Sequence, residues 1–326
     1  MKKITGINGF GRFSLHLLKY WLDHQSSAHF QISYINDDTL SIQDVFGIIT
    51  KDAYVIFDKY KISLSSDQLV ILGPNGQKNI IGYTTAPIPT IPWVGKPEIF
   101  LECSGKNTVA KDCEKYIAGN TELVVISATS WDAKTLIYGF NHVDDRDKSK
   151  IISYGSCTVN AYVPLANYLH KKYGIIDSDT HFIHNIPGYK LKDFNTLQRK
   201  FCTLEKSAPR LLDFISENNF TVNYTVVPYA GVSMLDFRFK LQKNTSKEKI
   251  IDDLEDVFLH GELAPLYHFQ ETDDGPETHK FTIYSAVFIK NNVRLLNNNV
   301  YLHGYFDNEN SVNRYFDLVN YISLNY

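Results

Sequence analysis

One cysteine stands at the point where an apolar stretch of the chain passes into an amphipathic one. The residues ISYGSCTVNAYVPLA (152–166) indicate a buried strand that turns at a glycine directly into a helix, with Cys157 in the first helical turn. The positive end of the helix dipole favours a thiolate there, and the free backbone N–H groups can hold an oxyanion. We expect Cys157 to be a nucleophile, although most free thiols are inert core residues.

The other cysteines, Cys103, Cys113 and Cys202, are scattered and form no C-x-x-C pair, which predicts neither a disulfide framework nor a metal site. Lys and Arg number 33 against 36 Asp and Glu, a net charge of -3, so the charge balance favours neither nucleic acid nor a membrane as partner. No apolar run approaches the roughly 20 residues that cross a bilayer, and MKKITGING is not the pattern of a signal peptide. We expect a cytoplasmic protein.

A glycine-rich turn follows the first predicted strand. In GINGFGRFS (6–14), Gly9 and Gly11 allow the backbone to approach a pyrophosphate at the start of the first helix, and Ser14 stands where a third glycine is usual. Asp37 ends the next strand, where a carboxylate would bind the adenosine ribose and repel a 2′-phosphate. These residues predict NAD as the cofactor, and the alternative is an ordinary tight turn and a strand-end Asp.

The elements that must position these residues fall into two halves. Short apolar stretches at 3–9, 31–37, 98–104, 122–127 and 150–156 predict buried strands with helical crossovers, and so a doubly wound parallel sheet of Rossmann type. Later come alternating runs at 222–241, 280–290 and 299–307, read as antiparallel strands, a helix at 246–259, an Asn-rich turn at 291–299 and a last helix at 311–324. The predicted fold class is α/β, with a second, α+β domain whose sheet is mainly antiparallel.

A family resemblance appears when the motifs are taken together. GINGFGR, YIND, ECSGK, VVISATS, FNH, GSCTVN, VPYAGVSMLD and FDNE…NR occur in the order found in glyceraldehyde-3-phosphate dehydrogenases, over nearly the whole chain. GINGFGR together with SCTVN is the most specific pair. The chain resembles a divergent member of that superfamily, which implies an NAD-binding domain at 1–156, completed by the C-terminal helix at 309–326, and a catalytic domain at 157–308.

The resemblance assigns the chemistry of the site. It implies that Cys157 attacks an aldehyde, that hydride then passes to the nicotinamide, and that a thioester remains on the sulfur until phosphate releases the acyl group. His184, in THFIHNIP, matches the family's catalytic base. His181 lies three residues earlier, would point to the opposite face of the strand, and is the alternative.

The resemblance also implies contacts with the cofactor. Asn308 matches the residue that binds the nicotinamide carboxamide, and Arg12 and Phe13 fall where the backbone meets the pyrophosphate. Ser104 and Ser127 fall at strand ends near the dinucleotide, and a simple capping role is equally open for each.

The phosphate-binding residues of the family are largely missing. Val226 stands where the family has an arginine, no threonine closely follows His184, and Glu205 in TLEKSA would repel an anion. Ser156 and Thr158 remain as substrate-site candidates. Lys190, Lys192, Arg199 and Arg238 are the residues that could rebuild an anion site, against the reading of each as solvated surface charge.

These departures define the functional hypotheses. The first is an NAD-dependent aldehyde dehydrogenase that acts on an aldehyde other than glyceraldehyde 3-phosphate. The alternatives are the glycolytic reaction with a rebuilt phosphate site, a non-redox acyl transfer through Cys157, and a regulatory protein on the same fold. The segment after His184 is about ten residues shorter than in the family, which puts the usual tetramer in doubt, and we expect a homo-oligomer of two or four chains.

Overall fold

The computed structural model describes residues 1–143, 149–186, 199–228, 231–307 and 310–325. The chain forms two compact units. The first comprises Met1–Leu136, Val143–Gly155 and Tyr315–Tyr326, and the second comprises Ile137–His142 and Ser156–Arg314. Within the described ranges, no helix combines the length and the apolar character that a membrane span needs.

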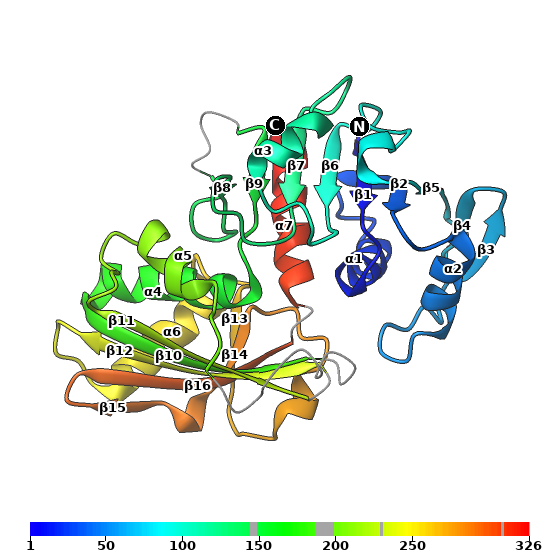
Figure 1. Ribbon diagram of the computed structural model, residues 1–326. Helices are drawn as coiled ribbons and strands as arrows, with labels where there is room; N and C mark the ends of the chain where they lie inside the picture. Colours follow the sequence, from blue (N-terminus) through cyan, green and yellow to red (C-terminus); the bar gives the residue numbers. More distant parts are fainter. Residues whose placement is uncertain (144–148, 187–198, 229–230, 308–309, 326) are drawn as a thin grey trace. The chain divides into compact units, whose positions relative to one another are not determined.

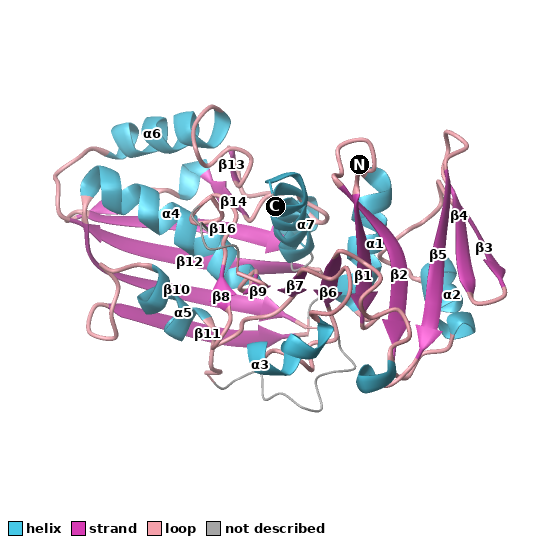
Figure 2. Cartoon of the chain, turned by 90° about the horizontal axis from the view of Figure 1, so that it is seen from above, coloured by secondary structure: helices cyan, strands magenta, loops and turns pink. Residues whose placement is uncertain are grey.

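The first unit is built on a sheet whose described strands follow the order β3-β4-β5-β2-β1-β6-β7-β9-β8. From β5 to β8 every neighbouring pair is parallel, as predicted, whereas β3 and β4 add an antiparallel edge that the sequence did not indicate (Figure 2). The strands are β1 (Lys3–Asn8), β2 (Phe30–Asp37), β3 (Lys61–Ser65), β4 (Gln68–Leu72), β5 (Lys78–Thr85), β6 (Ile99–Glu102), β7 (Leu123–Ile126), β8 (Lys134–Thr135) and β9 (Ile151–Ser153).

Burial explains why the central strands of this sheet form. Every residue of β6 and β7 is buried, which is expected of parallel strands covered by helices on both faces. The helices are α1 (Arg12–Asp23), α2 (Ile42–Lys51), α3 (Ala110–Cys113) and α7 (Asn310–Asn325), whose part from Tyr315 onward belongs to this unit. On α1, the side chains of Leu15, Leu18 and Trp21 are buried, as the helical spacing predicts.

The second unit holds a mixed sheet in the order β11-β10-β12-β16-β14-β13, with β15 paired to β16 (Figure 1). The strands are β10 (Ile175–Asn185), β11 (Phe220–Val227), β12 (Val232–Leu241), β13 (Tyr267–Gln270), β14 (Ala286–Ile289), β15 (Arg294–Leu296) and β16 (Asn299–Asp307). The helices are α4 (Cys157–Tyr173), α5 (Leu204–Leu211) and α6 (Lys247–Leu259).

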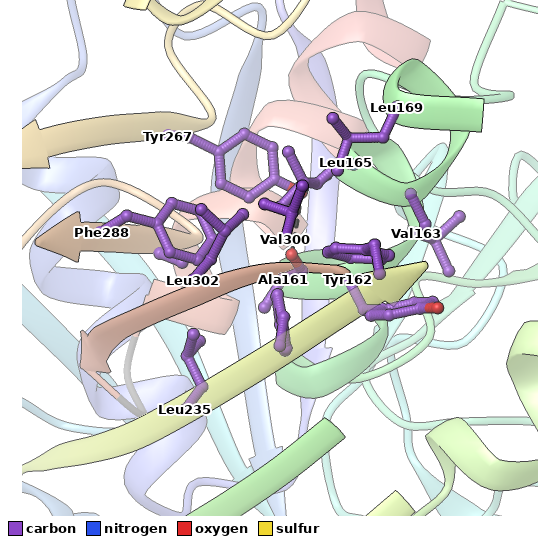
Figure 3. Packing of buried hydrophobic residues seen from close by; sticks show 14 of the residues in the cluster. Ala161, Tyr162, Val163, Leu165, Leu169, Leu235, Tyr267, Phe288, Val300 and Leu302 are labelled. Atoms are coloured by element: carbon purple, nitrogen blue, oxygen red, sulfur yellow. Dashed lines mark hydrogen bonds between the residues drawn. The ribbon is translucent and has the colours of Figure 1, made fainter. Parts of the chain in front are cut away.

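One hydrophobic core joins α4 and α6 to one face of this sheet. Figure 3 shows Ala161, Tyr162 and Leu165 of α4 against side chains of β12, β13, β14 and β16. The core fixes α4 along its length, so the first residue of the helix, Cys157, has a defined place above the sheet.

Two strand predictions in this unit need correction. β11 runs parallel to β10, not antiparallel, because the connection between them contains α5 and is no hairpin. Of the predicted strand at 280–290 only β14 forms, since Phe281 has a φ of 59° and takes the backbone out of the extended conformation. The Asn-rich turn is confirmed: Asn297 and Asn298, both at positive φ, join β15 to β16 as a hairpin.

The glycine-rich turn between β1 and α1 depends on close packing of two backbones. Gly9 has a φ of 90°, and a Cβ built there would collide with the backbone of Ser104, which follows β6. Gly11 has no such constraint, because a Cβ there meets no described atom within 4 Å. The two glycines therefore have different roles, although they lie in one motif.

We predict that Gly9→Ala lowers the free energy of unfolding by about 2–4 kcal/mol, because both the positive φ and the contact with Ser104 oppose a side chain. Gly11→Ala is the matched control and should cost about 1 kcal/mol or less, since Ala is a poorer helix N-cap than Gly but its side chain meets no neighbour. Urea unfolding of the two variants measures the difference. Equal losses would contradict the packing described for Gly9.

Candidate active site

A tight turn places Cys157 as the first residue of α4. Gly155 has a φ of 85°, and Ser156 caps the helix by accepting a hydrogen bond from Val159 N–H. No acidic residue lies in the first turn of α4, so the positive end of its dipole is not offset within the helix. The sequence prediction of a thiol at this helix end is confirmed.

Hydroxyl and thiol groups tie the start of α4 to the residues before α5. Ser156 Oγ lies 2.9 Å from Thr203 Oγ1, and Thr158 Oγ1 lies 3.5 Å from Cys202 Sγ. Thr158 is only 2% exposed. The two residues predicted as substrate ligands, Ser156 and Thr158, thus flank Cys157, and both hydroxyls already take part in contacts within the protein.

His184, near the end of β10, meets the cysteine. The distance between Cys157 Sγ and His184 Nε2 is 3.6 Å. On its other side, His184 Nδ1 lies 2.7 Å from the backbone carbonyl oxygen of Asn185. A carbonyl oxygen can only accept, so Nδ1 carries the proton and donates it, which leaves the lone pair of Nε2 toward the sulfur. This tautomer is the one that can take a proton from the thiol.

The charge state of His184 agrees with that role. Burial lowers the pKa of His184 to about 4, against the smaller, opposing effect of its hydrogen bond to the Asn185 carbonyl. The imidazole is therefore neutral near pH 7 and able to act as a base.

His181, the alternative base, lies on the opposite face of the sheet. It lines a cavity of about 470 Å³ together with Asp236, Arg238 and His303, and Cys157 does not contribute to that cavity. The alternation of side chains along β10 separates the two histidines, as predicted from their spacing of three residues.

In the first unit, the predicted dinucleotide residues gather at the carboxyl ends of β1, β2, β6 and β7. Among the described residues, no side chain caps the N-terminus of α1 at Gly11, so its first N–H groups are left for another acceptor. Burial by itself would raise the pKa of Asp37, but hydrogen bonds from the N–H groups of Phe10, Leu40 and Thr39 lower it overall. Asp37 is thus an anion at the end of β2, where the sequence placed it.

Arg12 and Phe13 direct their side chains into the protein. Arg12 binds the carboxylate of Asp52, and Phe13 packs edge-on against Tyr315 with ring centroids 5.2 Å apart. Their backbone N–H groups lie at the start of α1, where the resemblance implies contacts with a pyrophosphate.

The two serines lie at strand ends, as expected. Ser104 follows β6, binds Glu102 with both its backbone N–H and its hydroxyl, and supplies the surface on which Gly9 packs. Ser127 follows β7 and donates its N–H to the Glu102 carbonyl at 2.9 Å. Asn308 lies outside the described residues. All four cysteines are described and are free thiols, and the described residues contain no group of three or more His, Cys, Asp or Glu side chains that would hold a metal ion.

Comparison with known proteins finds relatives over nearly the whole chain. The chain is 27% identical to glyceraldehyde-3-phosphate dehydrogenase of Sclerotinia sclerotiorum, over 98% of this chain and 97% of the other. It is 26% identical to that of Podospora anserina with the same coverage, and 25% identical to glyceraldehyde-3-phosphate dehydrogenase B of Aspergillus oryzae over 98% of both chains. No family model matches the chain. This similarity over nearly the full length of the chain supports a divergent member of the glyceraldehyde-3-phosphate dehydrogenase superfamily.

The two arginines that were candidates for an anion site form ion pairs with carboxylates of the protein. Val226, in place of the family's arginine, pairs in register with His184 and is 1% exposed. Glu205 forms an ion pair with Arg199 at 2.9 Å, so its expected repulsion of an anion is partly offset. Arg238 binds Asp177 and Asp179 on the face opposite Cys157. Lys190 and Lys192 lie outside the described residues.

Sequence reasoning missed three residues at the site: Thr203, Cys202 and Tyr224. The ring of Tyr224 lies 5.5 Å from that of His184, centroid to centroid. Alternation along β11 could have found Tyr224, because it stands two residues before Val226 and faces the same side. No sequence signal points to Thr203 and Cys202, whose contacts depend on how α5 packs.

We predict that His184→Asn makes stability less dependent on pH. Because the folded-state pKa of His184 is about 4 and its ordinary value is 6.5, the unfolded wild-type chain binds more protons between these pH values, and the wild type loses stability as the pH falls through that window. The variant lacks this loss. Urea unfolding at both ends of the window measures it, with His181→Asn as control, and identical pH profiles for wild type and His184→Asn would rule out a buried neutral imidazole.

Proposed function

We propose that the protein is an NAD-dependent oxidoreductase that oxidises an aldehyde through a thioester on Cys157. The observation that carries the proposal is the 3.6 Å approach of Cys157 Sγ to the unprotonated Nε2 of His184. The names of the relatives support the same reaction class, since each is called a glyceraldehyde-3-phosphate dehydrogenase.

The residues of the pair act in sequence. Nε2 of His184 takes the thiol proton as Cys157 Sγ bonds to the aldehyde carbon, and the backbone N–H groups at the start of α4 stabilise the oxyanion that forms. Return of the proton gives a thiohemiacetal. NAD, when bound, supplies the acceptor for the hydride that this carbon loses. Nε2 then holds the hydroxyl proton, and a thioester is left on Cys157.

The residues of the first unit fit a dinucleotide. The Gly9 turn lies against Ser104 with no room for a side chain, and the uncapped N-terminus of α1 offers N–H groups to a pyrophosphate. Asp37 would hold the adenosine ribose, with Arg12 and Phe13 contributing backbone groups. Asn308, Ser104 and Ser127 complete the set that we assign to the cofactor.

We propose a substrate other than glyceraldehyde 3-phosphate. The glycolytic alternative needs a cation beside Cys157 to replace the missing arginine, and Arg199 and Arg238 are paired with carboxylates instead. We also propose that the chain works as a homo-oligomer, which light scattering of the purified protein would establish.

We predict that the protein forms NADH from NAD and an aldehyde. Cys157→Ser should abolish the reaction, and His184→Asn should slow it about a hundred- to ten-thousand-fold, the usual contribution of a general base. His181→Asn, on the same strand but the opposite face, should leave the rate unchanged. NADH absorbance measures all three.

Two results would overturn the proposal. One is that no aldehyde yields NADH while calorimetry shows no NAD binding, which would favour acyl transfer or a regulatory role. The other is an equal effect of the His181 and His184 substitutions, which would show that His184 is not the general base.

A further inference from the structure

The side chains of β11 form one wall beside the catalytic pair. In the parallel pairing of β10 with β11, Phe182 lies opposite Tyr224 and His184 lies opposite Val226. Register partners in neighbouring strands point to the same face, so Tyr224 and Val226 stand on the face where His184 meets Cys157. In the superfamily, the position of Val226 holds an arginine, so this wall has lost its cation.

Tyr224 lies beside the imidazole that meets the reacting sulfur. Burial raises the pKa of its hydroxyl, so the hydroxyl keeps its proton and can donate it in a hydrogen bond. Tyr224 and Cys157 pack, partly buried, against the same hydrophobic core.

The surroundings of the imidazole are apolar on two sides. The ring of Phe306 lies 5.9 Å from that of His184, and the ring of Tyr224 lies 5.5 Å from it, centroid to centroid. No charged group contributes to the lowered pKa of His184 among the described residues.

Arg199 is a charged residue beside this wall, and two partners hold its guanidinium. Arg199 donates a hydrogen bond to the Val222 carbonyl of β11 at 2.8 Å and forms its ion pair with Glu205. Both partners hold the guanidinium at the beginning of the strand, two residues before Tyr224. A phosphate beside Cys157 would lose its hydration and would find an apolar side chain at position 226, where the superfamily has an arginine.

We infer that the catalytic pair serves an uncharged aldehyde with an aliphatic or aromatic group beyond the carbonyl, and that Tyr224 is the specificity-determining residue for that group. The inference rests on the proposed function and names its substrate class. The ring of Tyr224 and the side chain of Val226 supply apolar contact, and the Tyr224 hydroxyl is the polar atom that can orient the substrate.

Alkylation of Cys157 tests the charge preference without any need for turnover. Iodoacetamide and iodoacetate are close in size and differ in charge, and peptide mass spectrometry reports the modification of Cys157 separately from the three buried thiols. For Cys157, the alkylation rate with iodoacetamide is divided by the rate with iodoacetate, and the same ratio is measured for 2-mercaptoethanol. The ratio for Cys157 should be larger by a factor of about ten or more, because the anion must give up its hydration. A ratio at or below that of the free thiol overturns the inference.

Variants of Tyr224 test the residue itself. Tyr224→Lys should reverse the preference toward iodoacetate, and Tyr224→Phe should retain it, because the ring remains. Tyr224→Phe also covers the case in which the lysine variant fails to fold. Tyr301→Lys, on an exposed residue that lines the opposite face of the sheet, is the matched control and should leave the ratio unchanged. An unchanged ratio in a folded Tyr224→Lys protein overturns the assignment of Tyr224.

Turnover separates this inference from the proposed function. With propanal, benzaldehyde and glyceraldehyde 3-phosphate as substrates, kcat/KM should be highest for an uncharged aldehyde, and Tyr224→Ala should raise its KM about tenfold with a smaller change in kcat. If glyceraldehyde 3-phosphate is preferred, the inference about the substrate class fails, but the proposed dehydrogenase activity stands. If none of the three yields NADH and calorimetry shows no NAD binding while the alkylation ratio is high, the charge preference stands and the proposed oxidation fails.

Discussion

The hydrogen bond from His184 Nδ1 to the backbone carbonyl of Asn185 determines which nitrogen faces the sulfur. Because the acceptor belongs to the main chain, it is present whatever side chain stands at 185, and the tautomer is set by the path of β10 alone. Burial then keeps the ring neutral by lowering its pKa. The base is thus prepared by the backbone and by the low polarity around it, with no carboxylate partner among the described residues.

Two structural supports hold the thiol against this ring. The core beneath α4 fixes the helix on the sheet, and the contacts of Ser156 and Thr158 with Thr203 and Cys202 fix its first turn. A hydrophobic core holds an element in place without specifying the position of one atom, whereas short polar contacts are directional. The core therefore holds α4 on the sheet, and the polar contacts orient its first turn, where Cys157 lies.

Local signals in the sequence were enough for the features that depend on a few consecutive residues. The glycine turn at Gly9, the helix that begins at Cys157 and the separation of His181 from His184 all follow from short-range geometry. The parallel direction of β11 and the position of Tyr224 beside His184 depend on pairing between distant segments, with α5 in the connection. The missing arginine at Val226 was visible in the sequence, and alternation along β11 places Tyr224 on the same side as Val226. Only the register of β10 and β11 shows that this side carries His184.

The carboxylate of Asp37 accepts three hydrogen bonds at Oδ1 and one at Oδ2, and only 8% of the residue is exposed. A carboxylate oxygen can accept about two hydrogen bonds comfortably, so Oδ2 keeps room for one more donor. A hydroxyl that arrives there meets an acceptor that is already immobilised by the protein. Its association therefore avoids the entropic cost of ordering that side chain, and more of the interaction energy is retained as affinity.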